Sequence, residues 1–101
     1  MKKVENKEQL IAVISKNRST LAERFGVSDI AVFGSYIHGT QHRGSDIDIL
    51  VELNREDKTF DNYMELKFFL SRVTGGKVDL VLKDAIRKEL KQKLLAEAVY
   101  V

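Results

Sequence analysis

Residues 34–51 read GSYIHGTQHRGSDIDILV and join a turn of small residues to a segment of alternating polarity. From residue 46 to residue 53, one side of this segment holds Ile47, Ile49, Val51 and Leu53, and the other holds Asp46, Asp48, Leu50 and Glu52. A period of two predicts a half-buried β-strand. Residues 29–33 are a short β-branched and aromatic run ending at Gly34, which predicts an earlier strand. The roughly twelve residues between the two strands are too few for a helix that crosses the sheet.

The flanking sequence predicts helices on both sides of these strands. Residues 8–25 carry apolar side chains at helical spacing, in one or two pieces with a break near Asn17, and Gly26 is a natural helix stop. A second helical stripe, from residue 63 to Gly75 and Gly76, precedes an alternating strand at residues 77–83. Asp84 is the expected N-cap of a last helix along which Ile86, Leu90 and Leu94 align. This order predicts an α/β (α+β) fold, a small sheet covered by helices.

The amino-acid composition excludes several classes of fold and function. The 101 residues predict one domain, residues 1–101, and 44% hydrophobic residues suffice for a small core. The absence of cysteine excludes disulfides, thiolate metal sites and thiol nucleophiles. Seventeen basic and fifteen acidic residues give a charge of +2, too weak a bias to indicate nucleic acid or a membrane as partner. The start of the chain has no apolar signal region, so we expect a cytoplasmic protein.

The turn at Gly34 and Ser35 is a candidate phosphate site. A strand that ends in glycine and passes into a helical turn presents free backbone N–H groups, and glycine allows a phosphate to approach closely. The Ser35 hydroxyl adds a further donor. The pair alone is a weak signal, because ordinary turns use the same residues.

Asp46, Asp48 and Asp79 are candidate metal ligands. Asp46 and Asp48 are two positions apart in one strand, so their carboxylates point to the same side of the sheet. Oxygen ligands suit hard cations such as Mg²⁺, and two such ions clamp the entering and leaving oxygens of a phosphoryl displacement. Asp79 lies on the polar side of another predicted strand. Taken singly, each aspartate has a plainer role, in which Asp46 caps a turn, Asp48 pairs with a cross-strand lysine and Asp79 pairs with Lys77.

The full spacing, G-S-x3-G-x5-S-D-x-D, resembles the signature of the minimal nucleotidyltransferases, small relatives of the DNA polymerase beta superfamily. The resemblance extends over nearly the whole chain and implies a mixed three-stranded sheet flanked by helices. It implies that Gly34, Ser35 and Ser45 hold a nucleoside triphosphate. It further implies that Asp46 and Asp48 bind Mg²⁺, with two ions expected, and that Asp79 is the third acidic ligand or a base.

Other residues fit this pattern less well. The family commonly has a small residue and then arginine before the second glycine, where this chain has Ile37 and His38. A zinc site at His38 and His42 is disfavoured, because no third nitrogen ligand is evident. The basic residues of the last helix, Arg87, Lys88, Lys91 and Lys93, fit a solvated helix face better than a binding surface.

The resemblance implies a metal-dependent nucleotidyltransferase that moves a nucleoside monophosphate, expected to be AMP from ATP, onto a hydroxyl. The small size is similar to that of stand-alone members that act as antitoxins beside a helical HEPN ribonuclease toxin, whose side-chain hydroxyl is then the acceptor. The alternative is a catalytically weak or inactive module that neutralises its partner by covering it. A third class, transfer to nucleic acid, is disfavoured by the small net charge. The sequence leaves the acceptor residue, the base preference and the oligomeric state open.

Overall fold

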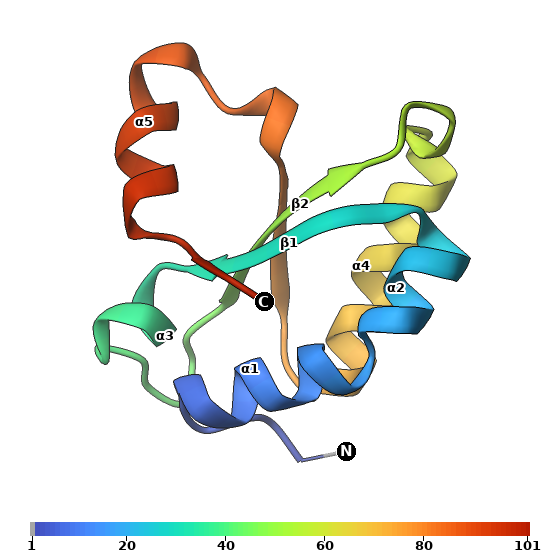
Figure 1. Cartoon of the computed structure of the whole chain (residues 1–101). Helices are drawn as coiled ribbons and strands as arrows, with labels where there is room; N and C mark the ends of the chain where they lie inside the picture. Colours follow the sequence, from blue (N-terminus) through green and yellow to red (C-terminus); the bar gives the residue numbers. More distant parts are fainter. Residues whose placement is uncertain (1) are drawn as a thin grey trace.

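A computed structural model describes residues 2–101 and contains five α-helices, two short 3₁₀ helices and four strands within that range (Figure 1). In chain order the elements are α1 (Lys7–Lys16), α2 (Arg18–Phe25), β1 (Val27–Phe33), α3 (Ser35–His38), β2 (Ile47–Leu53), η1 (Arg55–Asp57), α4 (Phe60–Thr74), β3 (Val78–Leu82), η2 (Lys83–Ala85), α5 (Lys88–Glu97) and β4 (Val99–Tyr100).

The strands form one mixed sheet in the order β3-β2-β1-β4. β1 runs antiparallel to β2 and β4, whereas β2 and β3 are parallel and are joined through α4. The mixed α/β fold class is therefore confirmed, but the expected count of three strands is wrong. The fourth strand has only two residues, which is too short to produce a recognisable alternation in the sequence.

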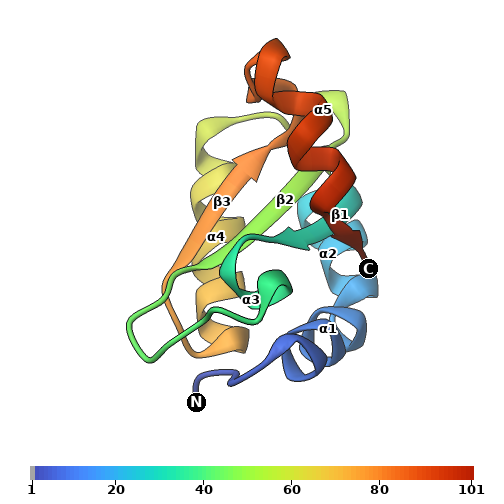
Figure 2. The ribbon, with the colours of Figure 1, turned by 90° about the vertical axis from the view of Figure 1, so that its left-hand side faces the viewer.

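The core lies between one face of the sheet and the helices α1, α2 and α4, which gather on the same side (Figures 1 and 2). The apolar side of β2 supplies Ile47, Ile49, Val51 and Leu53, and all four are buried as the alternation predicts. The opposite side carries Asp48 and Glu52 of β2 and Asp79 of β3, and we call it the acidic face. Leu50 also lies there yet is buried, so this face is covered in part. α3 and α5 stand on the side of the acidic face, away from α4 (Figure 2).

Helix ends follow the local sequence. α1 begins at the Asn6 cap, whose side chain accepts a hydrogen bond from the Gln9 N–H, and the chain breaks at Asn17 before α2. Gly26 ends α2 in the left-handed conformation. The predicted break and the predicted stop are both confirmed.

The expected role of Asp84 is wrong. Asp84 lies in η2, its carboxylate pairs with Lys58, and α5 begins only at Lys88, with Ile86 outside the helix. Asp84 and Lys58 are 26 positions apart in the chain, so a capping pattern, which involves only neighbouring residues, does not reveal this contact. Within residues 2–101, no helix is both long and apolar enough to cross a membrane.

Candidate active site

Gly34 connects β1 to α3, and this position requires glycine for two reasons. Its dihedral angles, φ 74° and ψ −148°, lie in a region that is essentially restricted to glycine. A Cβ atom at this position would overlap the side-chain carboxylate of Asp48. The turn and the carboxylate are therefore packed together, and no larger residue fits between them.

The short helix α3 begins at Ser35, the residue after Gly34. The Ile37 and His38 N–H groups both donate to the Gly34 carbonyl, at 3.0 and 3.1 Å. The Ser35 backbone hydrogen-bonds with Asp48 and favours the charged form of that carboxyl, which opposes its raised pKa. The backbone of Ser35, which the sequence suggests as a phosphate contact, thus already interacts with the Asp48 carboxyl group.

Asp48 and Asp79 occupy matching positions on neighbouring parallel strands, since the two residues are register partners in the β2–β3 pair. On its other side, Asp48 is opposite Phe33, the last residue of β1. Asp46 precedes β2 and is exposed. The sheet register therefore brings the carboxylate of Asp79 beside that of Asp48.

The pKa of Asp48 responds to the charges of Asp79 and Asp46. Burial, the charges of Asp79 and Asp46, and a side-chain hydrogen bond with Asp79 raise the pKa of Asp48 to about 6. Among residues 2–101, none of the three aspartates forms an ion pair with a basic residue. The plainer roles, in which Asp48 pairs with a lysine and Asp79 with Lys77, are therefore not what the structure shows.

The donor chemistry of this group fits a hard cation. Carboxylate oxygens are the ligands that Mg²⁺ prefers, and a cation relieves the repulsion that raises the pKa of Asp48. Within the described part of the chain, no three acidic, His or Cys side chains are placed so that they alone could hold a metal ion.

The raised pKa of Asp48 predicts a pH-dependent stability. The folded-state pKa, about 6, exceeds the unfolded value near 3.9, so the stabilising contribution of the protonated carboxyl is complete at low pH and is lost as pH rises through 6. In the absence of divalent cations, Asp48→Asn should raise the free energy of unfolding by about 1 kcal/mol at pH 7.5, allowing for solvent screening. At pH 4 this gain should vanish, as urea unfolding of both proteins would show. A difference that does not change with pH would contradict the burial argument.

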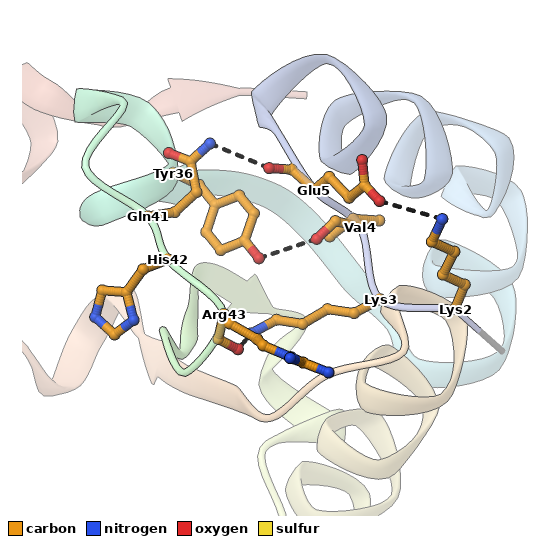
Figure 3. Close-up of a pocket in the computed structure, with 8 residues that line it drawn as sticks. All are labelled: Lys2, Lys3, Val4, Glu5, Tyr36, Gln41, His42 and Arg43. Carbon is orange, nitrogen blue, oxygen red and sulfur yellow. Dashed lines mark hydrogen bonds and ion pairs between the residues drawn. The ribbon is translucent and has the colours of Figure 1, made fainter.

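The loop between α3 and β2 is braced by the first residues of the chain (Figure 3). The Lys3 ammonium donates to the Arg43 and Ser45 carbonyls at 3.1 and 2.6 Å. The Tyr36 hydroxyl donates to the Val4 carbonyl at 3.0 Å from a buried position. These residues surround a pocket of about 470 Å³, which is lined by Lys2, Lys3, Val4, Glu5, Tyr36, Gln41, His42 and Arg43. The N-terminal segment therefore fixes the loop that leads to Asp46, a role for which the local sequence carries no signal.

Ser45 lies in the same loop and is half-buried. Its hydroxyl oxygen accepts a hydrogen bond from the His42 N–H at 2.9 Å, and its own hydrogen remains free to donate. His42 Nδ1 accepts from the Gly44 N–H at 3.2 Å, whereas His38 Nε2 lies 3.4 Å from Glu97 Oε2 of α5. His42 therefore makes its contacts within the loop between α3 and β2, whereas His38 links α3 to α5.

The Lys3 brace predicts a loss on removal of its charge. Lys3→Met keeps the side-chain length but leaves the Arg43 and Ser45 carbonyls without their donor, so the free energy of unfolding should fall by about 1–2 kcal/mol. Lys2→Met is the matched control, because Lys2 is 86% exposed and pairs only with Glu5, so its removal should cost about 0.5 kcal/mol or less. Thermal unfolding of both variants measures the difference. Equal effects would show that Lys3 does not brace the loop.

Residues 14–101 match the family described as the nucleotidyltransferase domain. The chain belongs to this family. It is 37% identical over 94 residues to the protein adenylyltransferase MntA of Thermococcus cleftensis, which covers 93% of this chain and 94% of that protein. A candidate protein adenylyltransferase of Methanocaldococcus jannaschii is 40% identical over 90 residues, covering 88% of this chain and 91% of the relative.

Solved structures show the same fold. A candidate minimal nucleotidyltransferase superposes with a TM-score of 0.74 at 28% identity, covering 89% of this chain and 93% of the other. A chain of a toxin–antitoxin crystal structure with AMP-PNP gives 0.68 at 30% identity, covering 84% and 69% respectively. The resemblance to the minimal nucleotidyltransferases is confirmed.

Proposed function

We propose that this nucleotidyltransferase-family chain transfers AMP from ATP to a hydroxyl of a protein partner and acts as the antitoxin for a helical HEPN toxin. The similarity to a protein adenylyltransferase supports the reaction, and the similarity to a chain of a toxin–antitoxin complex with AMP-PNP supports the partner and the nucleotide. The observation that carries the proposal is the pairing of Asp48 with Asp79 directly beside the Gly34 turn.

The residues of the site would have separate roles in binding the triphosphate and the metal ion. Gly34 gives the turn room beside the Asp48 carboxylate, and Gly34 with the hydroxyls of Ser35 and Ser45 would hold the triphosphate oxygens. Asp46 and Asp48, with Asp79, would hold Mg²⁺, which supplies charge neutralisation and orientation at the α-phosphate. Two ions are expected from the family pattern.

The reaction is a displacement at the α-phosphorus. The acceptor hydroxyl oxygen forms a bond to this phosphorus, the bond to the β-phosphate bridging oxygen breaks, and pyrophosphate leaves. Asp79 is exposed and adjoins Asp48, so it is placed to take the hydroxyl proton. The protein contributes positioning and electrostatics and forms no covalent intermediate.

One observation favours the alternative, a module that neutralises its partner by complex formation alone. His38 stands where the family commonly has arginine, and its ring faces Glu97. A permanent positive charge is therefore missing near the phosphate turn. The Asp48 carboxylate beside that turn, with the charges of Asp79 and Asp46 acting on it, weighs more strongly for catalysis.

The test of the proposed function is transfer to the partner itself. The product of the neighbouring reading frame, if it is a small helical protein, is purified with this chain and given ATP and Mg²⁺. A covalent AMP on the partner supports transfer, and a stable complex without any adduct supports neutralisation by covering.

A further inference from the structure

The chain has three tyrosines, and their hydroxyl groups are held in different ways. Tyr36 is buried, and its hydroxyl donates to the Val4 carbonyl at 3.0 Å. The Tyr63 hydroxyl donates to the Leu80 carbonyl at 2.6 Å. Tyr100 is 47% exposed, and within residues 2–101 its hydroxyl donates to no backbone carbonyl. Tyr100 therefore carries the most accessible phenol oxygen in the described part of the chain.

Tyr100 lies on the acidic face of the sheet. It is the register partner of Ala31 on β1, and Ala31 is the partner of Leu50 on β2. Side chains of paired residues share a face, and Leu50 follows Asp48 by two positions on the same side of β2. Val99, the other residue of β4, points to the opposite side and packs against the core. Tyr100 thus stands on the same face as the proposed metal ligands.

A contact with Lys83 shows where the Tyr100 ring lies. The Lys83 ammonium is 5.7 Å from the centroid of this ring and lies 3.5 Å from the Glu52 carboxylate. Lys83 follows β3 at one edge of the sheet, whereas β4 is the other edge. The two side chains therefore meet across β1 and β2, above the buried Ala31 and Leu50. The ring lies over the middle of the acidic face.

The distance between Tyr100 and Asp48 suits a nucleotide bound between them. With strands about 4.8 Å apart and a rise of about 3.3 Å per residue, their Cα atoms are separated by roughly 12 Å. The long tyrosine side chain and a phosphate held above Asp48 shorten this gap from both ends. Rotation of the exposed ring, a motion of nanoseconds, moves the hydroxyl over the face. β4 forms only two residue pairs with β1, so few contacts hold Tyr100 in one place.

We propose that Tyr100 accepts AMP within its own molecule when no partner hydroxyl occupies the site. The Tyr100 hydroxyl oxygen forms a bond to the α-phosphorus, the bond from this phosphorus to the β-phosphate bridging oxygen breaks, and pyrophosphate leaves. The phenol proton passes to the Asp79 carboxylate. The inference rests on the proposed function, because it uses the same triphosphate and the same aspartates. It adds an acceptor that belongs to this chain.

The test measures the intact mass of the whole chain after incubation with ATP and Mg²⁺ in the absence of a partner. The wild type should gain about 329 Da, the mass of one AMP transferred as pyrophosphate leaves. Trypsin should release the modified peptide 94–101, in which Tyr100 is the only residue with a hydroxyl group. Tyr100→Phe should lose the gain. Tyr63→Phe is the matched control and should gain the same mass as the wild type, because the Tyr63 hydroxyl is bound to Leu80.

A mixture of two variants tests whether the transfer occurs within one molecule. Tyr100→Phe keeps the proposed catalytic aspartates but has no acceptor, whereas Asp48→Asn keeps the acceptor but loses a proposed metal ligand. Neither variant should gain mass in the mixture. The modified fraction of the wild type at a fixed time should also stay constant over a tenfold range of protein concentration. A gain by Asp48→Asn in the mixture would show transfer between molecules and overturn the placement of Tyr100 over its own site.

Three other results separate this inference from the proposed function. An equal gain in the wild type and Tyr100→Phe would place the adduct on another residue and overturn the inference. An unmodified wild type, under conditions in which the partner gains AMP, would also overturn it but leave the proposed function standing. No gain by either protein would overturn both. Tyr100→Phe should still modify the partner, which shows that this variant is folded.

Discussion

Replacing both Asp46 and Asp48 by asparagine is expected to reduce AMP transfer by roughly a thousandfold or more. The two carboxylates are the proposed cation ligands, and a bound metal contributes several kcal/mol of transition-state stabilisation, of which about 1.4 kcal/mol is worth a factor of ten. The fold should remain, because the change relieves the repulsion that raises the pKa of Asp48. Transfer from labelled ATP and circular dichroism measure the two expectations.

Asp29→Asn is the control for this double variant. Asp29 is an exposed aspartate near the start of β1, at the opposite end of that strand from Gly34. Its replacement should leave transfer at the parent rate. If the double variant keeps more than a tenth of the parent activity, the carboxylates do not hold an essential metal.

Gly34→Ala should be the most damaging single change at the site. Alanine at this position must adopt backbone angles that are nearly exclusive to glycine, and its Cβ overlaps the Asp48 carboxylate. We expect the free energy of unfolding to fall by about 3 kcal/mol, together with loss of nucleotide binding. Chemical unfolding and calorimetry with ATP and Mg²⁺ measure these effects.

Gly39→Ala is the control that separates the steric overlap with Asp48 from the cost of placing a non-glycine residue at positive φ. Gly39 also has a positive φ, 73°, but apart from its two chain neighbours no residue has an atom within 4 Å of the position that its Cβ would take. This variant should lose only about 1 kcal/mol and should keep its nucleotide affinity. Similar losses in the two variants would mean that the contact between Gly34 and Asp48 is unimportant.

The features that could be predicted from the sequence are those with a local signature. The alternation at residues 46–53 predicts a strand because burial on one face requires it, and Ile47, Ile49 and Val51 are indeed buried. The break at Asn17 and the stop at Gly26 are likewise local. Asp79 was a candidate because it lies on the polar side of its strand, and the parallel register with β2 brings it to Asp48.

The features that were missed depend on contacts between distant residues. Lys3 reaches carbonyls 40 and 42 positions away, and Asp84 binds Lys58 instead of capping α5. The spacing of Leu90, Lys93, Leu94 and Glu97 shows that they share a helix face, but the sequence does not show that this face meets Gly34. Such pairings are fixed by the packing of whole elements, for which a single sequence carries no local signal.

The intact mass of the partner, measured after incubation with this chain, ATP and Mg²⁺, tests the central claim most directly. The account predicts that a Tyr, Ser or Thr of the partner gains about 329 Da per AMP as pyrophosphate leaves. With Asp48→Asn the complex should form, but the mass should not change. A tight complex without an adduct, and equal neutralisation of the partner by the wild type and Asp48→Asn, would contradict catalysis and leave neutralisation by covering.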